Sequence, residues 1–130
     1  MAYLHDSWVV HRDIKPGNIM LGDFAEVQLL DWGIARKIDE QEPIEQRVLS
    51  LTGTPGYMAP EQILMKQDIQ LPLSDVYALG AVLYEILTLR RPLEDPDPEE
   101  LMVRCCSEDP QPPSLRTPER TVPLELDEIC

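Results

Sequence analysis

The sequence predicts a mainly α-helical fold with one small β-hairpin near its N-terminal end. Helical spacing of apolar residues between 75 and 89, and a clear helix start at Asp97-Pro98, indicate the helices. Two short apolar runs on either side of a Gly-Asp turn, between residues 19 and 30, indicate the hairpin. With 130 residues, 43% of them apolar, the chain is long enough to bury one hydrophobic core.

The hairpin should bring two polar segments close together. Ile19–Leu21 is expected to pair with Val27–Leu30 across a turn at Gly22-Asp23. The polar octet of residues 11–18 precedes the first strand, and Asp31-Trp32-Gly33 follows the second. Because the two strands of a hairpin run antiparallel, both polar segments should lie at its open end.

The other segments before residue 72 are expected to be short or irregular. Met1–Asp6 reads as the end of a helix, and Val9-Val10 as a short extended segment. Residues 36–52 are polar, show no period and predict a long loop. Gly53–Tyr57 is rich in turn residues, and a proline at position 60 can open a short helix through Met65.

The longest helix should be central. Ser74 is a suitable N-cap for a helix that starts at Asp75 and ends near Leu89, before Pro92. Small residues occupy many of the positions between its large apolar residues, so the helix should be apolar nearly all round and buried. Its large apolar residues recur at helical spacing: Val76, Leu79, Val82, Leu83, Ile86 and Leu87.

The last third of the chain predicts two more helices with an irregular segment between them. Asp97 as N-cap, proline next and acids after it predict a helix that ends near Ser107. Five prolines between Pro110 and Pro123 predict an extended, irregular connection. Residues 124–130 have the pattern of an amphipathic helix.

Composition excludes several classes of partner and compartment. Acids outnumber bases by 24 to 11, giving a net charge of −13, which argues against nucleic acid and anionic membranes as partners. The longest apolar stretch, Val76–Leu89, is too short to span a membrane and contains Glu85. Cys105, Cys106 and Cys130 form neither a disulfide framework nor a zinc motif. With no signal-peptide pattern at the start, these features predict a cytoplasmic protein with reduced thiols.

The octet His11–Asn18 contains the residue types that phosphoryl transfer requires. Asp13 can orient a substrate hydroxyl and accept its proton, and Lys15 can neutralise charge on a phosphoryl group. Asn18 and Asp31 offer oxygen ligands of the kind that Mg²⁺ prefers. The plainer interpretation is a solvated loop followed by an ordinary Asp-x-Gly turn. Motif order decides between the two.

The order of motifs resembles the C-terminal lobe of a eukaryotic-like Ser/Thr protein kinase of the bacterial type. The pattern H-R-D-x-K-P-x-N is followed by Asp31-Trp32-Gly33, then by Gly53–Glu61 and Ser74–Gly80. The resemblance covers residues 1 to about 92 closely and the rest more loosely. It implies a partial kinase domain over residues 1–130, within a two-lobed α+β parent fold. The catalytic loop would be 11–18, the activation segment 31–61 and the C-lobe helices 75–130.

The resemblance implies roles for the catalytic residues. Asp13 would be the catalytic base, with Lys15 and Thr54 assisting at the active site. Lys15, Asn18 and Asp31 would bind the cofactors, ATP and Mg²⁺, and the last two would be the metal ligands. The substrate would be a Ser or Thr hydroxyl of a protein.

Structural roles also follow from the resemblance. His11 would support the loop by packing and hydrogen bonding. Trp32 stands below the metal ligand, where the family usually has Phe in an Asp-Phe-Gly motif that Gly33 completes; the plainer alternative for Trp32 is a core anchor. Glu61 would close the activation segment and pair with an Arg further along the kinase chain. Asp75 would bind the backbone of the catalytic loop, although acids are favoured at any helix N-terminus.

One further set of residues would be regulatory. Arg12 would meet a phosphate on the activation segment, placed on Ser50, with Thr52 as the second choice. The alternative is that both hydroxyls are ordinary loop residues.

Three hypotheses follow for the chain as a whole. The first is a truncated Ser/Thr kinase, without the N-lobe and the last C-lobe helices, that binds ATP weakly and transfers no phosphate alone. Its parent could be membrane-tethered outside this segment. The second is a non-catalytic kinase-like module that binds a partner. The third, an unrelated helical protein, would lack the hairpin between Asn18 and Asp31.

Overall fold

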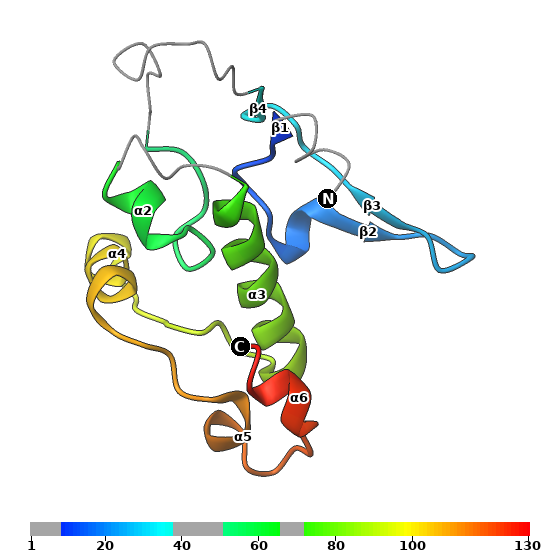
Figure 1. Cartoon of the computed structure of the whole chain (residues 1–130), viewed down its shortest axis with the longest axis vertical. Helices are drawn as coiled ribbons and strands as arrows, with labels where there is room; N and C mark the ends of the chain where they lie inside the picture. Colours follow the sequence, from blue (N-terminus) through cyan, green and yellow to red (C-terminus); the bar gives the residue numbers. More distant parts are fainter. Residues whose placement is uncertain (1–8, 38–50, 66–71) are drawn as a thin grey trace.

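A computed structural model describes residues 9–37, 51–65 and 72–130, with one long helix at its centre (Figure 1). The strands are β1 (Val9–Val10), β2 (Ile19–Leu21), β3 (Val27–Leu29) and β4 (Arg36–Lys37), and a 3-10 turn, Pro16–Asn18, precedes β2. The helices are α2 (Pro60–Ile63), α3 (Leu73–Thr88), α4 (Pro98–Ser107), α5 (Pro113–Arg116) and α6 (Leu124–Asp127). The mainly helical fold with a small hairpin agrees with the sequence prediction.

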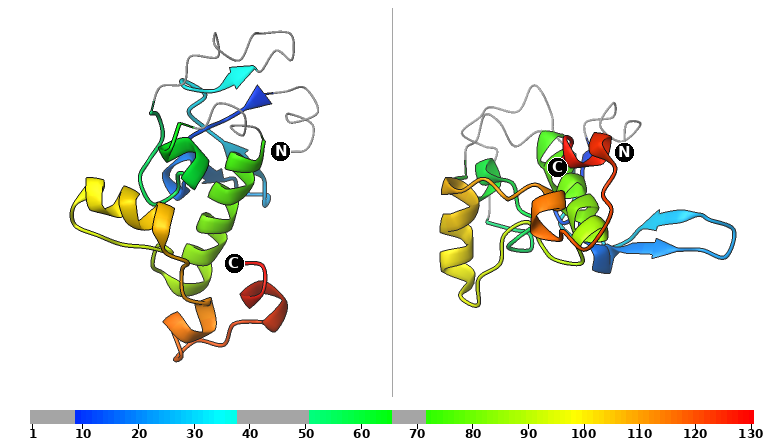
Figure 2. Two further views of the ribbon diagram at one scale, coloured as in Figure 1. Left: turned by 60° about the vertical axis from the view of Figure 1, so that its left-hand side comes forward. Right: turned by 90° about the horizontal axis from the view of Figure 1, so that it is seen from below.

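The predicted hairpin is present as β2 and β3. The strands pair antiparallel, with Ile19 opposite Leu29, and the Gly22 N–H closes the turn on the Glu26 carbonyl at 2.8 Å. The hairpin projects away from the helices, and Phe24 at its end is 87% exposed (Figures 1 and 2). Its presence removes the reason to consider an unrelated helical protein.

A second, smaller sheet was not expected. β1 pairs antiparallel with β4, with Val10 opposite Arg36, so the predicted loop over 36–52 begins instead with two strand residues. Each strand has only two residues, and such a pattern is too short to read as a strand until its distant partner is known. Residues 38–50 lie outside the described part of the chain, as does the helix end predicted for Met1–Asp6.

Helix α3 begins earlier than predicted. Its first residue is Leu73 and its N-cap is Pro72, so the assignment of Ser74 as N-cap was wrong. The Ser74 hydroxyl instead donates to Glu61 Oε1 at 3.0 Å. At the other end, Leu89 takes the left-handed conformation, φ 58°, and its N–H donates to the Glu85 carbonyl.

Burial of α3 is one-sided. Ala78, Ala81 and Tyr84 are buried, whereas Val76 and Ile86 are 53% and 62% exposed, so the prediction of burial all round was wrong. The structure has two small cores, and α3 contributes to the first. This first core consists of Ile14, Ala78 and Val82, with Ile19, Leu29 and Tyr57 packed against it. The second consists of Leu93, Leu101 and Cys105, with Ile63 packed against it.

Helix α4 follows its sequence signals closely. Asp97 is the N-cap, its carboxylate accepts from the Glu99 N–H at 2.9 Å, and Pro98 occupies the first helical position. The helix ends at Ser107, as predicted. The cap satisfies a backbone donor that the helix itself leaves without a partner.

The proline-rich connection is more ordered than predicted. It contains α5, which begins at Pro113, and the Ser114 N–H and hydroxyl each donate to the Asp127 carboxylate at 2.7 Å. The Tyr84 hydroxyl donates to the Gln111 carbonyl at 2.8 Å and so fixes the segment to α3. α6 covers only part of the predicted 124–130 helix. Within the described residues, no helix combines the length and apolarity that crossing a membrane requires.

Candidate functional site

The backbone of the polar octet is held by one buried carboxylate. Asp75, 1% exposed in the first turn of α3, accepts from the backbone N–H groups of His11 and Arg12, both at 2.9 Å. This is the contact that the kinase resemblance implied for Asp75. It fixes the start of the octet to the central helix through two charge-assisted hydrogen bonds.

Arg12 has a left-handed backbone, φ 73°, which is costly for a residue with a Cβ. Its N–H is held by Asp75, and its carbonyl accepts from Gln62 Nε2 at 3.4 Å. The carbonyl also lies 3.1 Å from the position that a Cβ on Gly53 would take. Hydrogen bonds on both sides of one strained residue keep the octet in an unusual conformation, as is common at functional sites.

The His11 ring holds the octet through hydrogen bonds of its two nitrogens. The side chain is fully buried; its Nδ1 accepts from the Asp13 N–H at 3.3 Å, and its Nε2 lies 3.0 Å from the Leu30 carbonyl. Because Nδ1 accepts, the ring proton belongs on Nε2, which donates to Leu30. His11 thus links the octet to the end of the hairpin.

Trp32 packs edge-on against His11, with 4.7 Å between ring centroids, and its indole N–H donates to the Leu29 carbonyl at 2.9 Å. The indole is 41% exposed, so the alternative of a core anchor was wrong for the described structure. Gly33 follows, and its N–H donates to Asp31 Oδ1 at 3.3 Å.

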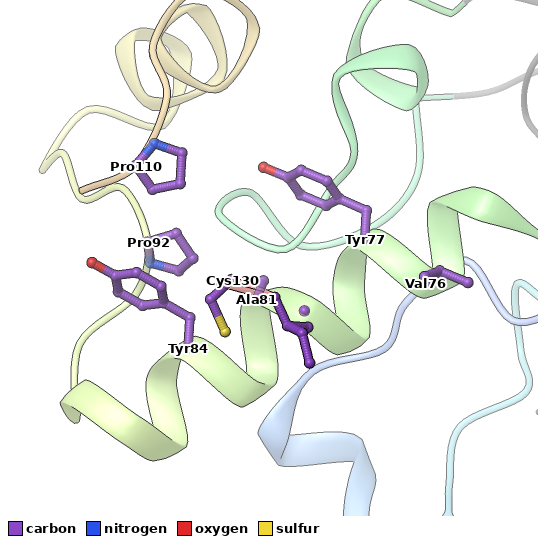
Figure 3. Close-up of a pocket in the computed structure, with 9 residues that line it drawn as sticks. Val76, Tyr77, Ala81, Tyr84, Pro92, Pro110 and Cys130 are labelled. Carbon is purple, nitrogen blue, oxygen red and sulfur yellow. The ribbon is translucent and has the colours of Figure 1, made fainter. Parts of the chain in front are cut away.

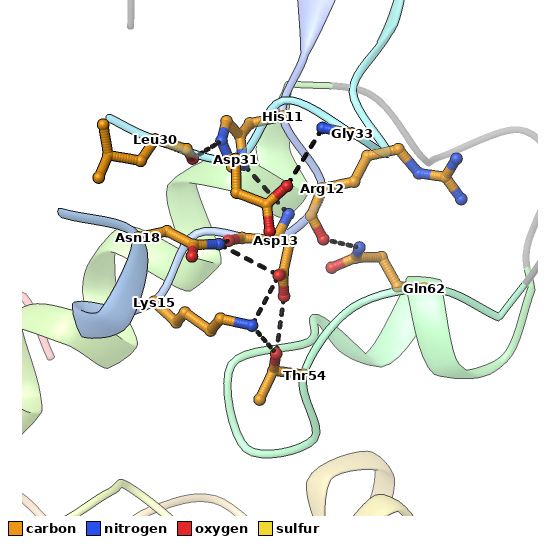
Figure 4. Close-up of polar contacts among 10 residues, drawn as sticks. All are labelled: His11, Arg12, Asp13, Lys15, Asn18, Leu30, Asp31, Gly33, Thr54 and Gln62. Carbon is orange, nitrogen blue, oxygen red and sulfur yellow. Dashed lines mark hydrogen bonds and ion pairs between the residues drawn. The ribbon is translucent and has the colours of Figure 1, made fainter. Parts of the chain in front are cut away.

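The Asp13 carboxylate is the centre of the polar cluster (Figure 4). Lys15 Nζ lies 2.7 Å from Asp13 Oδ2 and 2.8 Å from Thr54 Oγ1. The Thr54 hydroxyl donates to Asp13 Oδ1 at 2.7 Å, and Asn18 Nδ2 donates to Asp13 Oδ2 at 3.1 Å and to the Asp13 carbonyl at 2.8 Å. The fold therefore joins the predicted catalytic residues from two segments far apart in sequence.

These contacts lower the pKa of Asp13. Burial alone raises it, but the hydrogen bonds from Lys15, Thr54 and Asn18, together with the Lys15 charge, outweigh burial. The carboxylate is therefore ionised at neutral pH and presents a negative charge beside the Lys15 ammonium.

The two residues predicted as metal ligands both lie at the open end of the hairpin, Asn18 just before β2 and Asp31 shortly after β3. Asn18 donates with its amide nitrogen, which leaves its amide oxygen for a ligand, and Asp31 keeps a carboxylate oxygen besides the one that accepts from Gly33. Oxygen donors of this number fit Mg²⁺, which usually takes one or two protein ligands and completes its shell with phosphate and water. Among the described residues, no three His, Cys, Asp or Glu side chains gather into a metal cluster.

Thr54 owes its position to a tight turn. The Tyr57 N–H donates to the Thr54 carbonyl at 3.1 Å, with proline second and Gly56, φ 90°, third. Proline and a positive-φ glycine in that order are the signature of a type II turn. The Tyr57 hydroxyl donates to Glu85 on α3, so the turn is fixed to the same helix as the octet.

The regulatory prediction is only partly within the described structure. Arg12 is half-buried, and burial, followed by the nearby charge of Arg36, lowers its pKa. Thr52 is described, whereas Ser50 lies outside the described residues. Sequence reasoning did not find Arg36, because its closeness to Arg12 depends on the pairing of β1 with β4.

Glu61 and Gln62 connect α2 to its surroundings. Glu61 accepts from Ser74, which is a contact that the sequence did not predict. Gln62 Oε1 accepts from the Ala59 N–H at 3.0 Å, which caps α2, while Nε2 reaches the Arg12 carbonyl. The glutamine at the third helical position is a known capping signal, so its first contact could have been found from sequence.

A separate cavity of about 230 Å³ lies against α3 (Figure 3). None of its lining residues takes part in the Asp13 cluster, so it is distinct from the candidate site. They are mainly apolar or aromatic: Val76, Tyr77, Gly80, Ala81, Tyr84, Pro92, Pro110, Ile129 and Cys130.

Comparison with known proteins identifies the family to which the sequence is similar. The pattern that defines the protein kinase domain matches residues 1–122. The serine/threonine-protein kinase PknD of Protochlamydia amoebophila is 38% identical over 97% of this chain, and PknB of Mycobacterium tuberculosis is 39% identical over 89%. A probable serine/threonine-protein kinase of Streptomyces coelicolor is 36% identical over 96%.

The matched region is a small part of these relatives. The chain spans 14% of the Protochlamydia kinase and 18% of each of the other two. All three are bacterial Ser/Thr kinases by name, and such domains in general use ATP and Mg²⁺. The match to the family pattern covers most of the chain, and the chain therefore belongs to the protein kinase domain family.

Proposed function

We propose that this chain is part of the C-terminal lobe of a bacterial Ser/Thr protein kinase. In this assignment residues 11–18 are the catalytic loop, 31–61 the activation segment and 75–130 the lobe's helices. The complete enzyme transfers the γ-phosphate of ATP to a Ser or Thr hydroxyl of a protein. The observation that carries the proposal is the Asp13 carboxylate, held between Lys15 and Thr54.

The chemistry assigned to Asp13 follows from its contacts. As the substrate hydroxyl oxygen attacks the γ-phosphorus, the bond from phosphorus to the ADP oxygen breaks, and the hydroxyl proton passes to Asp13. A carboxylate whose pKa is lowered is a weak base. Its main contribution is therefore to orient the hydroxyl and to accept the proton late in the reaction.

Lys15 and Thr54 have supporting roles in this proposal. The Lys15 ammonium, 2.8 Å from the Thr54 hydroxyl, provides positive charge where the transferred phosphoryl group would lie. Asn18 and Asp31 would hold Mg²⁺, which neutralises the phosphates of ATP when it is bound. The Asn18 amide also holds the Asp13 main chain and so ties the metal ligand to the base.

Regulation is assigned to Arg12 in the catalytic loop and Arg36 in the activation segment. A phosphate on Ser50, or on Thr52 as the alternative, would add a charge of about −1.5 to −2. Burial and then the nearby charge of Arg36 lower the pKa of Arg12, and a phosphate would favour the charged form of Arg12. Because ATP is abundant in the cytoplasm, we place this part of the enzyme there.

A chimeric kinase tests the proposal directly. This chain would replace the matching region of Mycobacterium tuberculosis PknB, which supplies the remainder of a kinase domain, and phosphate transfer from labelled ATP to a Ser/Thr peptide would be measured. We expect transfer by the chimera and its loss in Asp13→Asn. Asp23→Asn, which changes an exposed acid on the hairpin, is the matched control and should retain activity.

The chimera also separates the proposal from the alternative of a non-catalytic binding module. An intact Asp13, Asn18 and Asp31 set has no purpose in a pure scaffold, which favours the enzyme. A folded chimera without transfer would favour the module. The 130-residue chain alone is expected to transfer no phosphate, and Asp13-dependent autophosphorylation by that chain would contradict this expectation.

A further inference from the structure

The side chain of Gln62 connects two segments that lie 50 residues apart in sequence. Gln62 is 5% exposed in α2, so its amide group is removed from water and needs partners inside the protein. Its Oε1 accepts from the Ala59 N–H at 3.0 Å, and its Nε2 donates to the Arg12 carbonyl at 3.4 Å (Figure 4). One amide group therefore reaches both the start of its own helix and the octet.

The orientation of this amide follows from its two partners. The Ala59 N–H is a donor and the Arg12 carbonyl is an acceptor, so the amide oxygen must face Ala59 and the nitrogen must face Arg12. The bond to Ala59 is a local cap of α2, which glutamine at the third helical position commonly makes. The bond to Arg12 is long at 3.4 Å, and the cap does not require it. This second bond therefore needs an explanation of its own.

The Arg12 carbonyl is a meeting point for both ends of the segment that carries Thr54. At one end, a Cβ on Gly53 would lie 3.1 Å from this oxygen, so the Gly53 backbone packs directly against it. At the other end, Gln62 Nε2 donates to the same oxygen. Thr54 follows Gly53 directly, and its hydroxyl donates to Asp13 at 2.7 Å. Contacts at both ends with one carbonyl therefore hold the whole segment against the octet.

The peptide group between Arg12 and Asp13 is held at both of its polar atoms. Its carbonyl accepts from Gln62, and its N–H, which belongs to Asp13, donates to His11 Nδ1 at 3.3 Å. The backbone is strained at Arg12, where φ is 73°, so the surrounding contacts must hold this conformation in place. Loss of the Gln62 bond should therefore be visible as faster hydrogen exchange at the Asp13 N–H.

We propose that Gln62 is a positioning residue that ties the end of the activation segment to the catalytic loop through the Arg12 carbonyl. This tether keeps the Thr54 segment against the octet, so that the Thr54 hydroxyl stays on Asp13. Because Gln62 acts through the octet, its loss should lower the rate of phosphate transfer more than the affinity for ATP. The meaning for catalysis rests on the proposed function, whereas the tether itself can be measured without enzyme activity.

Two variants of the full chain separate the tether from the cap. Gln62→Met removes both hydrogen bonds, whereas Gln62→Glu, measured at pH 8 with its carboxyl group ionised, can accept from Ala59 but cannot donate to Arg12. We expect the Asp13 N–H to exchange about two- to tenfold faster in both variants, the range that loss of one neutral hydrogen bond allows. The Ala59 N–H should exchange faster in Gln62→Met alone. Gln111→Glu, at an exposed glutamine, is the matched control and should change neither rate.

The two amide protons also define the results that contradict the tether. A change confined to the Ala59 N–H would show that Gln62 only caps α2, and would overturn the proposal. Exchange at the Asp13 N–H no faster than in Gln111→Glu would have the same meaning. If Gln62→Glu does not fold, Gln62→Met is judged at the same two protons.

Kinetics of the chimeric kinase then test the catalytic meaning. In the Gln62→Glu chimera kcat should fall while KM for ATP is unchanged, and the Gln111→Glu chimera should keep both values. An unchanged kcat, or a KM for ATP that rises as much as kcat falls, would contradict the positioning role. A chimera that is inactive before either substitution, beside the expected exchange rates in the full chain, would count against the proposed function and leave the tether standing.

Discussion

Replacing Asp75 tests whether one buried carboxylate holds the polar octet to α3. Asp75 is 1% exposed and accepts from the N–H groups of His11 and Arg12 at 2.9 Å each. In Asp75→Asn one carboxylate oxygen becomes an amide nitrogen, which cannot accept a hydrogen bond. One backbone N–H is then left facing a donor in the protein interior.

The expected loss is set by that hydrogen bond and not by the helix dipole. Breaking a hydrogen bond to a charged group costs about 1.5–3 kcal/mol, whereas an acid at a helix N-terminus contributes about 0.3–1 kcal/mol. Asp75→Asn should therefore lower the free energy of unfolding by about 1.5–3 kcal/mol. Small domains are stable by about 5–15 kcal/mol in total, so the loss is easily measured.

Urea denaturation followed by circular dichroism gives the free energy, and amide hydrogen exchange locates the change. The amide protons of His11 and Arg12 should exchange faster in the variant than in the parent chain. Asp109→Asn removes an exposed acid and is the control, expected to stay within about 0.5 kcal/mol of the parent. A loss for Asp75→Asn below about 1 kcal/mol, with unchanged exchange at both amides, would refute this reasoning, since the helix dipole alone accounts for a loss of that size.

Three further predictions concern other parts of the structure. Asp97→Ala removes the α4 cap and should cost about 1 kcal/mol in urea denaturation; no loss would contradict the cap. Gly53→Ala should lower the thermal midpoint, because φ is 131° and the new Cβ would lie 2.9 Å from Met58 Cγ; an unchanged midpoint would speak against this. Asp13 has a lowered folded-state pKa, so its contribution to stability is complete above its unfolded pKa of about 3.9 and is lost as pH falls through the folded value. The stability difference between the parent chain and Asp13→Asn should therefore shrink from about pH 6 to about pH 3, and a constant difference would exclude the effect.

Signals that act over a few residues predicted structure well. The cap, proline and acids from Asp97 onward gave the start of α4, and the Gly22-Asp23 turn gave the hairpin. In each case the residues that specify the element also make its contacts, so no distant partner is needed.

Contacts made between distant segments could not be predicted in this way. Strand β4 exists because Arg36 pairs with Val10, and Ser74 is drawn from its expected capping role by Glu61. The candidate site also combines residues that local motifs predicted with contacts that only the fold reveals. The identity of the residues around Asp13 was predicted from the motif order, whereas the place of Gln62 on the Arg12 carbonyl depends on where the fold puts α2. The roles assigned to these residues stay predictions.

The two segments of the candidate site are placed by a single rigid element. Asp75 in the first turn of α3 holds the octet that contains Asp13, and Glu85 in its last turns holds the turn that contains Thr54. At about 1.5 Å per residue, these two anchors are roughly 15 Å apart along one helix, which resists changes in that spacing. The 2.7 Å contact between Asp13 and Thr54 therefore depends on α3 acting as a fixed spacer, although no α3 residue touches the Asp13 carboxylate among the hydrogen bonds described. A second glycine inside α3, in addition to Gly80, that leaves the helix folded but more flexible should weaken this contact without changing either anchor.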